Sequence, residues 1–216
     1  MDENRVWSEF TAQNRNTHSA SLMPMVEAAL AAAGTEMAEL DAVAAVTGPG
    51  SFTGVRIGVA TAKGLAHGAG LPCMAVDALE ALSASAGDFD GVVCPIQDAR
   101  AGQVYCAAFR QGKRLTEDAP MKLEDFLEAI SGMGERFLFT GDGVPVFRDR
   151  IREIMGDRAA FAPVQLGYLR PSAAGDVALR NGGTVDYLHL EASYLRPPNA
   201  QKNRKLMESM KRVEEA

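Results

Sequence analysis

The amino-acid sequence predicts an α/β protein of two subdomains, in which short apolar strands alternate with helices. Three observations support this class. Apolar runs with β-branched residues recur between helix-like runs, and a glycine-rich turn at 48–58 joins one such strand to one such helix. In addition, 47% of the 216 residues are hydrophobic and 23% are charged, so the chain can bury a substantial core.

The first predicted unit covers residues 1–97. Its first helix is expected over 19–33, because apolar residues recur there at helical spacing and Gly34 ends the pattern. The next expected elements are a strand at 41–47, a helix at 52–68, a strand at 72–76 and a helix at 78–85.

The second predicted unit covers residues 98–198 and is joined to the first near residue 97. A terminal helix at 199–216 is expected to pack back on the first unit. The elements expected in and just before the second unit are strands at 91–96, 102–110 and 136–140, and helices at 122–130, 145–155 and 172–180.

The glycine-rich turn is the most informative segment. Gly48 and Gly50 permit backbone conformations that other residues resist. Pro49 fixes one dihedral angle, and Ser51 can cap the following helix. These features favour a tight turn with close packing, and they leave phosphate binding open because free N–H groups at a helix start attract anions. The turn lacks the lysine followed by Ser or Thr that a P-loop requires.

The charge balance argues against direct binding of nucleic acid. The chain has 22 basic and 28 acidic residues and a net charge of −6, whereas surfaces that bind phosphates are usually basic. Basic residues gather at 202–212, but acidic residues offset them. We interpret this terminal segment as a solvated helix, with an RNA-guiding tail as the alternative.

The cysteines and the hydropathy indicate a cytoplasmic protein. Cys73, Cys94 and Cys106 have no C-x-x-C spacing and are predicted to be buried free thiols of a reducing compartment. No apolar run approaches the length of a membrane span, and the first residues do not resemble a signal peptide.

Groups able to catalyse a reaction are few. The histidines are His18, His67 and His189. No two of them lie within one helical turn, so a metal site built on a histidine pair is not expected. Asp98 and Asp142 follow predicted strands, where aspartates usually bond to their own backbone, and Asp98 is expected to pair with Arg100. The sequence therefore predicts no catalytic residue, no metal and no cofactor.

Four stretches point to a family. Gly-Pro-Gly-Ser-Phe-Thr-Gly-Val-Arg-Ile-Gly at 48–58 continues as Ala-Lys-Gly-Leu-Ala at 62–66, and Thr-His-Ser at 17–19, Asp-Ala-Arg at 98–100 and Tyr-Leu-Arg-Pro at 194–197 accompany it. Together they resemble the TsaB family of tRNA threonylcarbamoyladenosine biosynthesis proteins over most of the chain. The signature residues of the turn are Gly48, Pro49, Gly50, Ser51, Gly54 and Arg56.

This resemblance implies an actin-like, sugar-kinase-like ATPase fold with two subdomains. It also implies a non-catalytic scaffold that binds and activates a TsaD-like catalytic subunit together with the ATPase TsaE. The complex would make N6-threonylcarbamoyladenosine at the adenosine adjoining the anticodon of tRNA, and this chain would reach tRNA only through the complex. Without TsaD, the chain is expected to form a homodimer through the same surface.

The partner interface is expected on the helices at 18–33 and 52–68. Glycines four residues apart on the second helix would expose a flat backbone stripe to a partner helix. The candidate contacts are Leu22, Met25, Val26, Ala29, Val55, Val59 and Ala62. Because these residues are expected at the surface, Val59→Arg is predicted to block binding while leaving the fold largely intact.

The resemblance also implies an opening strand that this chain lacks. Members of the family begin with an apolar strand and an Asp-containing turn, and no such segment precedes Asp2. Residues 5–10 are expected to be the tail of that hairpin, which leaves the first subdomain without its opening strand. The alternative function is a small ATP-dependent phosphotransferase of the same fold, with the turn from Gly48 to Gly54 holding phosphate.

Overall fold

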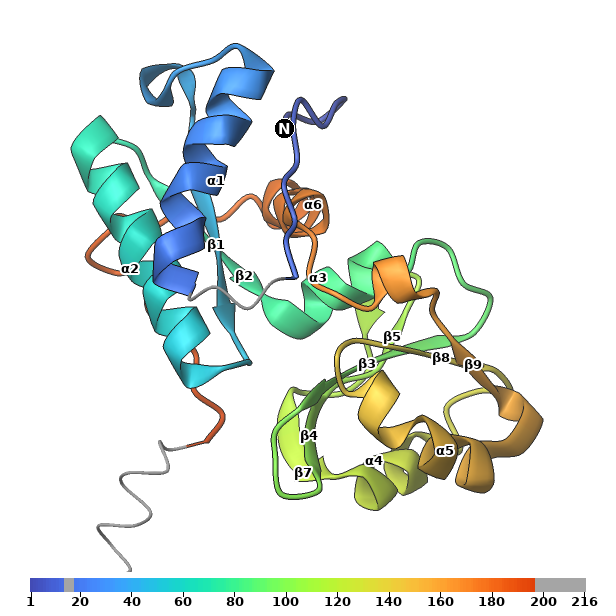
Figure 1. Ribbon diagram of the computed structural model, residues 1–216. Helices are drawn as coiled ribbons and strands as arrows, with labels where there is room; N and C mark the ends of the chain where they lie inside the picture. The colour runs from blue at the N-terminus through green and yellow to red at the C-terminus, as the bar shows by residue number, and fades with distance from the viewer. Residues whose placement is uncertain (14–17, 197–216) are drawn as a thin grey trace, which may run out of the picture.

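The computed structural model describes residues 1–13 and 18–196 and shows a mixed α/β chain of two subdomains (Figure 1). The first subdomain contains a two-stranded parallel sheet, and the second contains a seven-stranded sheet. The predicted fold class is confirmed.

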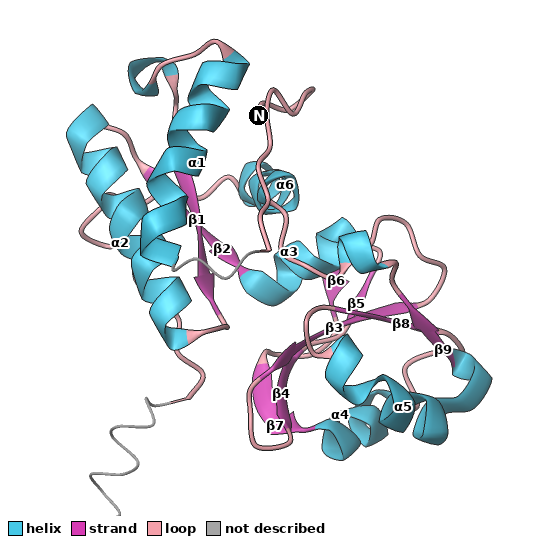
Figure 2. Ribbon diagram, in the orientation of Figure 1, coloured by secondary structure: helices cyan, strands magenta, loops and turns pink. Residues whose placement is uncertain are grey.

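The first subdomain has helices on both sides of its small sheet. Helices α1 and α2 lie on one side of β1 and β2, and α3 and α6 lie on the other (Figure 2). Its elements are α1 (His18–Ala33), η1 (Met37–Glu39), β1 (Val43–Gly48), α2 (Phe52–Ala69), β2 (Cys73–Asp77), α3 (Ala78–Ser85) and α6 (Pro171–Asn181).

Local caps fix where these helices begin and end. Ser51 caps α2 by accepting a hydrogen bond from the Gly54 N–H at 3.4 Å, as the sequence predicts. Gly70 ends α2 in the left-handed conformation at φ 69°. Asp77 caps α3 by accepting from the Glu80 N–H at 2.7 Å.

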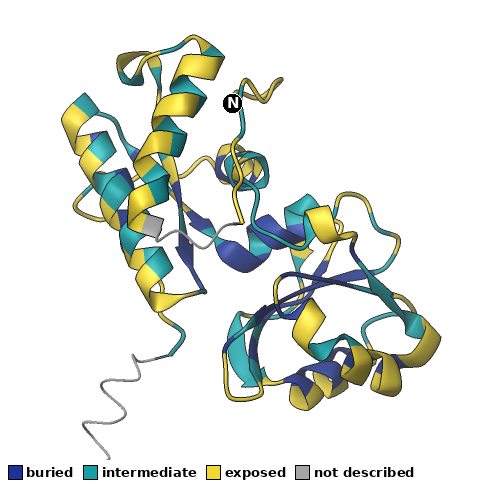
Figure 3. Cartoon of the chain, viewed as in Figure 1, coloured by how far each residue is buried: buried dark blue, intermediate teal, exposed yellow. Residues whose placement is uncertain are grey.

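The core of the first subdomain is made of small side chains. Val59 is 6% exposed and Ala62 is 5% exposed, and both lie on the face of α2 that covers β1. Ala45, Ala66, Cys73 and Leu190 complete this cluster. Much of the surface of α1 and α2 stays exposed (Figure 3).

The second subdomain is built on a larger, mostly antiparallel sheet. Its strands follow the order β6-β5-β3-β4-β7, and β8 and β9 extend the sheet from β3 by parallel pairing. Its elements are β3 (Val92–Asp98), β4 (Gln103–Cys106), β5 (Phe109–Arg110), β6 (Lys113–Arg114), β7 (Ala119–Lys122), α4 (Leu123–Ile130), β8 (Phe137–Thr140), α5 (Val144–Met155), η2 (Gly156–Arg158), β9 (Ala159–Phe161) and η3 (Val164–Leu166).

The core of this subdomain contains large buried side chains. Phe126 is 2% exposed, and Phe137 and Phe139 are 0% exposed. Helices α4 and α5 supply much of the apolar cover, with Leu127 and Ile151 among the buried residues. The face of these helices turned away from the sheet is exposed (Figure 3).

One expected strand is divided in the structure. The run 102–110 forms β4 and β5, because the backbone leaves the ladder at Ala108. There the Ala108 N–H donates to Thr116 Oγ1 at 2.9 Å, and the Leu115 N–H donates to the Ala108 carbonyl at 2.7 Å. The short strands β6, β7 and β9 were not expected from the sequence, since only pairing with a neighbouring strand defines segments this short.

The last part of the described chain returns to the first subdomain. Helix α6 packs against α3, β2 and β1, and Leu190 is buried in the first core. The predicted boundaries 1–97 and 98–198 therefore do not describe the packing, because a two-stranded sheet needs cover on both faces and α6 supplies one of them. The terminal helix expected at 199–216 lies outside the described residues.

The N-terminal segment does not form a strand. Residues 5–10 were expected to be the tail of a hairpin, but they pair with no strand of the described chain. Instead Ser8 Oγ donates to the Ala29 carbonyl of α1 at 2.7 Å, and Glu9 binds the start of α6. This N-terminal arm (residues 5–10) thus bridges α1 and α6. In the part of the chain that the structure describes, no strand pairs with β1 on the side away from β2.

Candidate functional site

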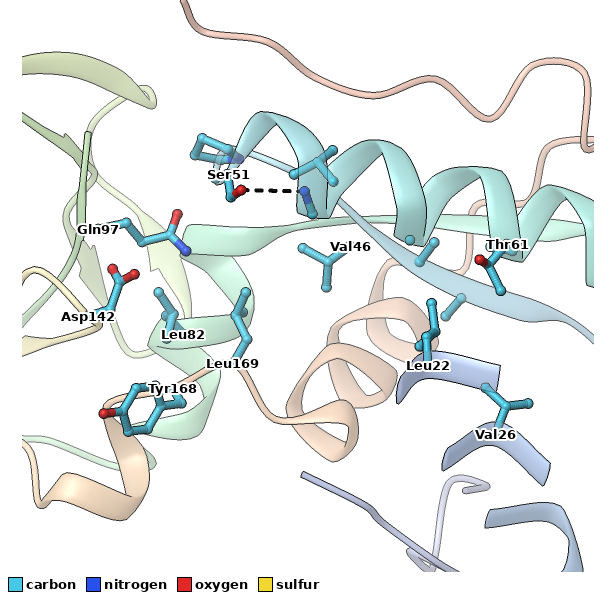
Figure 4. A pocket seen from close by; sticks show the side chains of 18 of the residues that line it. Leu22, Val26, Val46, Ser51, Thr61, Leu82, Gln97, Asp142, Tyr168 and Leu169 are labelled. Carbon is cyan, nitrogen blue, oxygen red and sulfur yellow. Dashed lines mark hydrogen bonds between the residues drawn. The ribbon is translucent and has the colours of Figure 1, made fainter. Parts of the chain in front are cut away.

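A cavity of about 560 Å³ lies beside β1, between the two subdomains (Figure 4). One end is apolar and the other is polar. Leu22 and Val26 of α1 lie at the apolar end, and Gln97 and Asp142 lie at the polar end next to the glycine turn. The remaining lining residues are Gln13, Val43, Ala44, Ala45, Val46, Pro49, Gly50, Ser51, Gly54, Val55, Gly58, Thr61, Ala62, Leu65, Leu82, Gly167, Tyr168 and Leu169.

The polar end contains one buried group without a hydrogen bond. Gln97 is 8% exposed, and its Oε1 has no partner in the described chain. Asp142 accepts a hydrogen bond from the Asp98 N–H at 3.2 Å. Burial of the Asp142 carboxylate, together with the nearby charge of Asp98, raises the pKa of Asp142. Gln97 was not predicted from the sequence, although an amide directly after the apolar run of β3 is a signal that could have found it.

Asp98 and Asp142 both accept hydrogen bonds from backbone N–H groups. Asp98 accepts from the Arg100 N–H at 2.8 Å and pairs with the Arg100 guanidinium at 3.2 Å, which confirms the expected ion pair. Arg100 and Ala101 both have positive φ, so the turn after β3 is a strained left-handed one that these hydrogen bonds support. The side chain of Arg100 is exposed, and the pair is therefore a weak one.

The glycine turn is shaped by packing. Gly48 has a φ of 126°, and a Cβ at this position would lie 2.5 Å from the Ser193 carbonyl oxygen. The Ser193 N–H donates to the Thr47 carbonyl at 2.8 Å, so the returning chain lies directly on the turn. This close approach supports the packing interpretation of Gly48.

Phosphate binding by the same turn has less support. The Ser51 hydroxyl already occupies the Gly54 N–H, and Arg56 points its guanidinium over the Phe52 ring at 5.0 Å. Among the described residues that line the cavity there is no Lys or Arg to neutralise a phosphate.

The expected interface residues differ in how far they are buried. Val59 and Ala62 lie in the core of the first subdomain, so the expectation that they are surface contacts is wrong. Their spacing places them on one face of α2, but only the tertiary structure shows that β1 covers this face. Val55 is half-buried beside the same core. The four candidates on α1, Leu22, Met25, Val26 and Ala29, are all half-buried.

The other faces of α2 are open. A Cβ built at Gly58, Gly64 or Gly68 would meet no atom of the described chain within 4 Å. Ala60 and Gly64 are exposed and lie on the side of α2 away from Val59. We call Ala60, Gly64 and Gly68 the outer face of α2.

A second charged cluster lies at the start of α3 and links the two subdomains. Arg114 pairs with Asp77 at 2.9 Å and also with Asp118. Burial and the neighbouring Asp77 carboxylate raise the pKa of Asp118 to about 7, against the opposing effect of Arg114. Burial also raises the pKa of the Cys106 thiol to about 12, and Asp118 adds to this effect.

The cysteines and the possible metal ligands of the described residues form no metal-binding cluster. Cys73, Cys94 and Cys106 are free and buried, as predicted. The described residues hold no group of three or more His, Cys, Asp or Glu side chains placed to bind a metal. None of the helices in the described ranges is long and apolar enough to cross a membrane.

The two-subdomain α/β architecture with a cavity between the subdomains defines the class as actin-like. The family model of TsaD, tRNA N6-adenosine threonylcarbamoyltransferase, matches residues 6–185. The structure is similar to an uncharacterized protein from Pseudomonas aeruginosa with similarity to peptidase YEAZ. The TM-score is 0.67 and the identity is 29%, with 83% of this chain and 85% of the other covered.

Two relatives with assigned names identify the family within this class. The TsaB protein of Bacillus subtilis, named for tRNA threonylcarbamoyladenosine biosynthesis, is 33% identical over 203 residues, or 88% of this chain and 87% of its own. The TsaB protein of Escherichia coli is 33% identical over 189 residues, or 83% of this chain and 80% of its own. The chain therefore belongs to the TsaB family, as the sequence motifs indicate.

Proposed function

We propose that this protein is a non-catalytic scaffold subunit in the synthesis of N6-threonylcarbamoyladenosine in tRNA. It binds and activates a TsaD-like catalytic subunit, acts together with a TsaE-like ATPase, and contacts tRNA only through the complex. The proposal draws on the names of its relatives and on the finding that the described residues hold no group of His, Cys, Asp or Glu side chains placed to bind a metal. The matching family model is that of the transferase itself, so the lack of catalysis in this chain is part of the proposal.

The observation that carries the proposal is the outer face of α2. Its glycines leave open space at the surface of an 18-residue helix, and a partner helix can approach such a backbone closely. Exposed Met23 on α1 and Phe52 at the start of α2 add apolar surface, at 37% and 36% exposed. We place the interface on the outer face of α2 and on α1, with Met25 and Ala29 as α1 contacts. The same surface forms a homodimer when the catalytic subunit is absent.

The test is complex formation with the TsaD-like subunit of the same source, measured by size-exclusion chromatography with light scattering. The wild-type chain is expected to give a shared stoichiometric peak, and Gly64→Arg is expected to abolish it. Replacing a helical glycine also removes a helix penalty of about 1 kcal/mol, so this variant should melt no lower than the wild type. Loss of binding could then not be attributed to unfolding.

The matched control is Val146→Arg on α5, where Val146 is 60% exposed and lies in the other subdomain. It should form the complex normally. If the wild-type chain is folded, as judged by circular dichroism, but gives no shared peak, the scaffold proposal is overturned. In a reconstituted tRNA modification assay, omitting this chain should lower the rate, and omitting the TsaD-like subunit should abolish the reaction.

The alternative is a small ATP-dependent phosphotransferase that uses the turn from Gly48 to Gly54. The described residues that line the cavity include no Lys or Arg that could bind phosphate. Calorimetry with Mg-ATP separates the two functions, because the scaffold is expected to give no binding heat. The three buried free thiols support a reducing compartment, and we place the scaffold in the cytoplasm.

A further inference from the structure

Two exposed aromatic rings lie together at the start of α2. The ring centroids of Phe52 and Tyr194 are 5.1 Å apart, with an interplanar angle of 39°. Phe52 is 36% exposed and Tyr194 is 47% exposed. The Ser193 N–H donates to the Thr47 carbonyl at 2.8 Å, so the backbone beside Tyr194 is tied to the glycine turn. Tyr194 therefore rests on Phe52 and keeps much of its ring open to solvent.

This aromatic pair does not belong to the cavity beside β1. Gly54, Val55 and Gly58 of α2 line that cavity, whereas Phe52 and Arg56 are not part of its lining. Because Phe52 and Arg56 are four residues apart, they share one face of the helix. The same stripe continues along the helix as the outer face of α2. The pair thus stands at one end of that outer face.

Arginines gather at the aromatic pair. The Arg56 guanidinium lies over the Phe52 ring at 5.0 Å. Arg196 follows Tyr194 by two residues, and its Nη1 donates to the Ala99 carbonyl at 2.7 Å. The next residue is Arg100, whose side chain is 87% exposed. Within the described chain no ion pair involves Arg56 or Arg196, so their positive charge is not neutralised by a carboxylate.

The amino-acid sequence continues this charge. Residues 196–207 include four basic residues and no acidic one, although the whole chain has a net charge of −6. The four are Arg196, Lys202, Arg204 and Lys205. Charge is therefore distributed unevenly along the chain, and the net value does not describe the segment that carries Tyr194.

We propose that the aromatic pair and its arginines bind single-stranded RNA, with a base stacked on Tyr194 and phosphates bound by Arg56 and Arg100. Unpaired bases stack on exposed aromatic rings, and arginines neutralise the adjoining phosphates. The arginines and the basic sequence after them favour a polyanion over an apolar protein surface. The contact goes beyond the proposed scaffold role, in which tRNA reaches this chain only through the complex, because it adds a weak direct contact made there.

The probe is a fluorescein-labelled oligouridylate of about ten nucleotides, with binding to the full chain followed by anisotropy at about 20 mM salt. The wild type is expected to bind weakly and saturably. Tyr194→Ala should weaken binding about fivefold or more, because the stacking surface is lost. Tyr194→Phe keeps the ring and should bind like the wild type. Circular dichroism checks that each variant is folded.

Two arginine variants test the phosphate contact. Arg56→Gln should weaken binding and lower the slope of log Kd against log salt by about one. The matched control is Arg148→Gln, since Arg148 also lies over an aromatic ring, Phe161 at 4.4 Å, but in the second subdomain. This control should bind the oligouridylate like the wild type.

Three results would overturn the proposal. They are no saturable binding to the folded wild type, equal binding by Tyr194→Ala and Tyr194→Phe, and loss of the shared peak with the TsaD-like subunit in Tyr194→Ala. The last result would show that a protein covers this ring. Gly64→Arg should bind the oligouridylate normally while losing the shared peak, so failure of the RNA contact is distinguishable from failure of the scaffold.

Discussion

The two subdomains pack their sheets in different ways. In the second, β3 has neighbours on both sides, and Phe137 and Phe139 are 0% exposed beneath two helices. In the first, β1 has one neighbouring strand among the described residues, and the cluster on its α2 side is built from alanines, Val59, Cys73 and Leu190. Buried apolar area is the main source of stability, so the second subdomain carries the larger share. Much of the surface of α1 and α2 in the first subdomain stays exposed, and there we place the proposed partner interface.

Phe139→Ala should have the largest effect on stability. Removing a fully buried phenyl ring beside Phe161 leaves a cavity and should lower the free energy of unfolding by about 3–5 kcal/mol. Urea denaturation followed by circular dichroism measures this loss. Leu188→Ala, at a position 64% exposed, is the control and should stay near the wild type. A loss below about 1 kcal/mol for Phe139→Ala would contradict the picture of a tightly packed second core.

Val59→Arg should damage the first subdomain selectively. The charge would enter a core of small side chains without a partner, at a cost of about 3 kcal/mol. Amide hydrogen exchange should speed up in α2, β1 and β2 and stay slow in β3 and β8. The neighbouring Ala60→Arg, at an exposed site, should leave exchange unchanged. Equal acceleration in both subdomains would show that they unfold as one unit.

Asp118→Asn should change how stability depends on pH where the subdomains meet. Because the pKa of Asp118 is raised to about 7, the native state binds a proton more tightly than the unfolded chain does. Asp118 therefore makes the protein less stable as pH rises from about 4 to about 7. Between these two pH values, the free energy of unfolding of the asparagine variant should fall by roughly 1–3 kcal/mol less than that of the wild type. Urea titrations at several pH values measure this difference. If the free energy of unfolding changed with pH equally in the variant and the wild type, the raised pKa of Asp118 would be contradicted.

Glu9→Gln should have the smallest effect. Burial works against the charge of Glu9, but hydrogen bonds from Arg170 and Ser172 lower its pKa overall. Its stabilising contribution is present above its unfolded pKa and is lost as pH falls through the lowered value. The substitution should cost about 1 kcal/mol at pH 7 and little at pH 3, by thermal denaturation. A cost that is equal at both values would mean that Glu9 acts through packing alone.

Much of the fold could be predicted from local patterns. The helix expected over 78–85 is α3 at the same bounds, and α1 and α2 match within one residue. Ser51 was predicted as a cap because the geometry of a helix start depends on neighbouring residues only. Strands were harder, since 102–110 divides where Thr116, eight residues from Ala108, captures a backbone N–H.

The candidate site was less predictable. Helical spacing identified the face of α2 that contains Val59 and Ala62, but the same spacing describes a core and an interface equally well. Gln97, Leu82 and Leu169 meet at the cavity from distant parts of the sequence, and no local pattern brings them together.

The sequence by itself determined the family, the α/β class and the turn at Gly48, because motifs, periodicity and caps depend on residues close together in the chain. Only the tertiary structure decided which faces of α1 and α2 are covered, and that α6 returns to the first subdomain. It also decided that the edge of β1 borders a cavity. Burial and strand pairing arise from contacts between residues far apart in sequence, and such contacts leave no periodic signal.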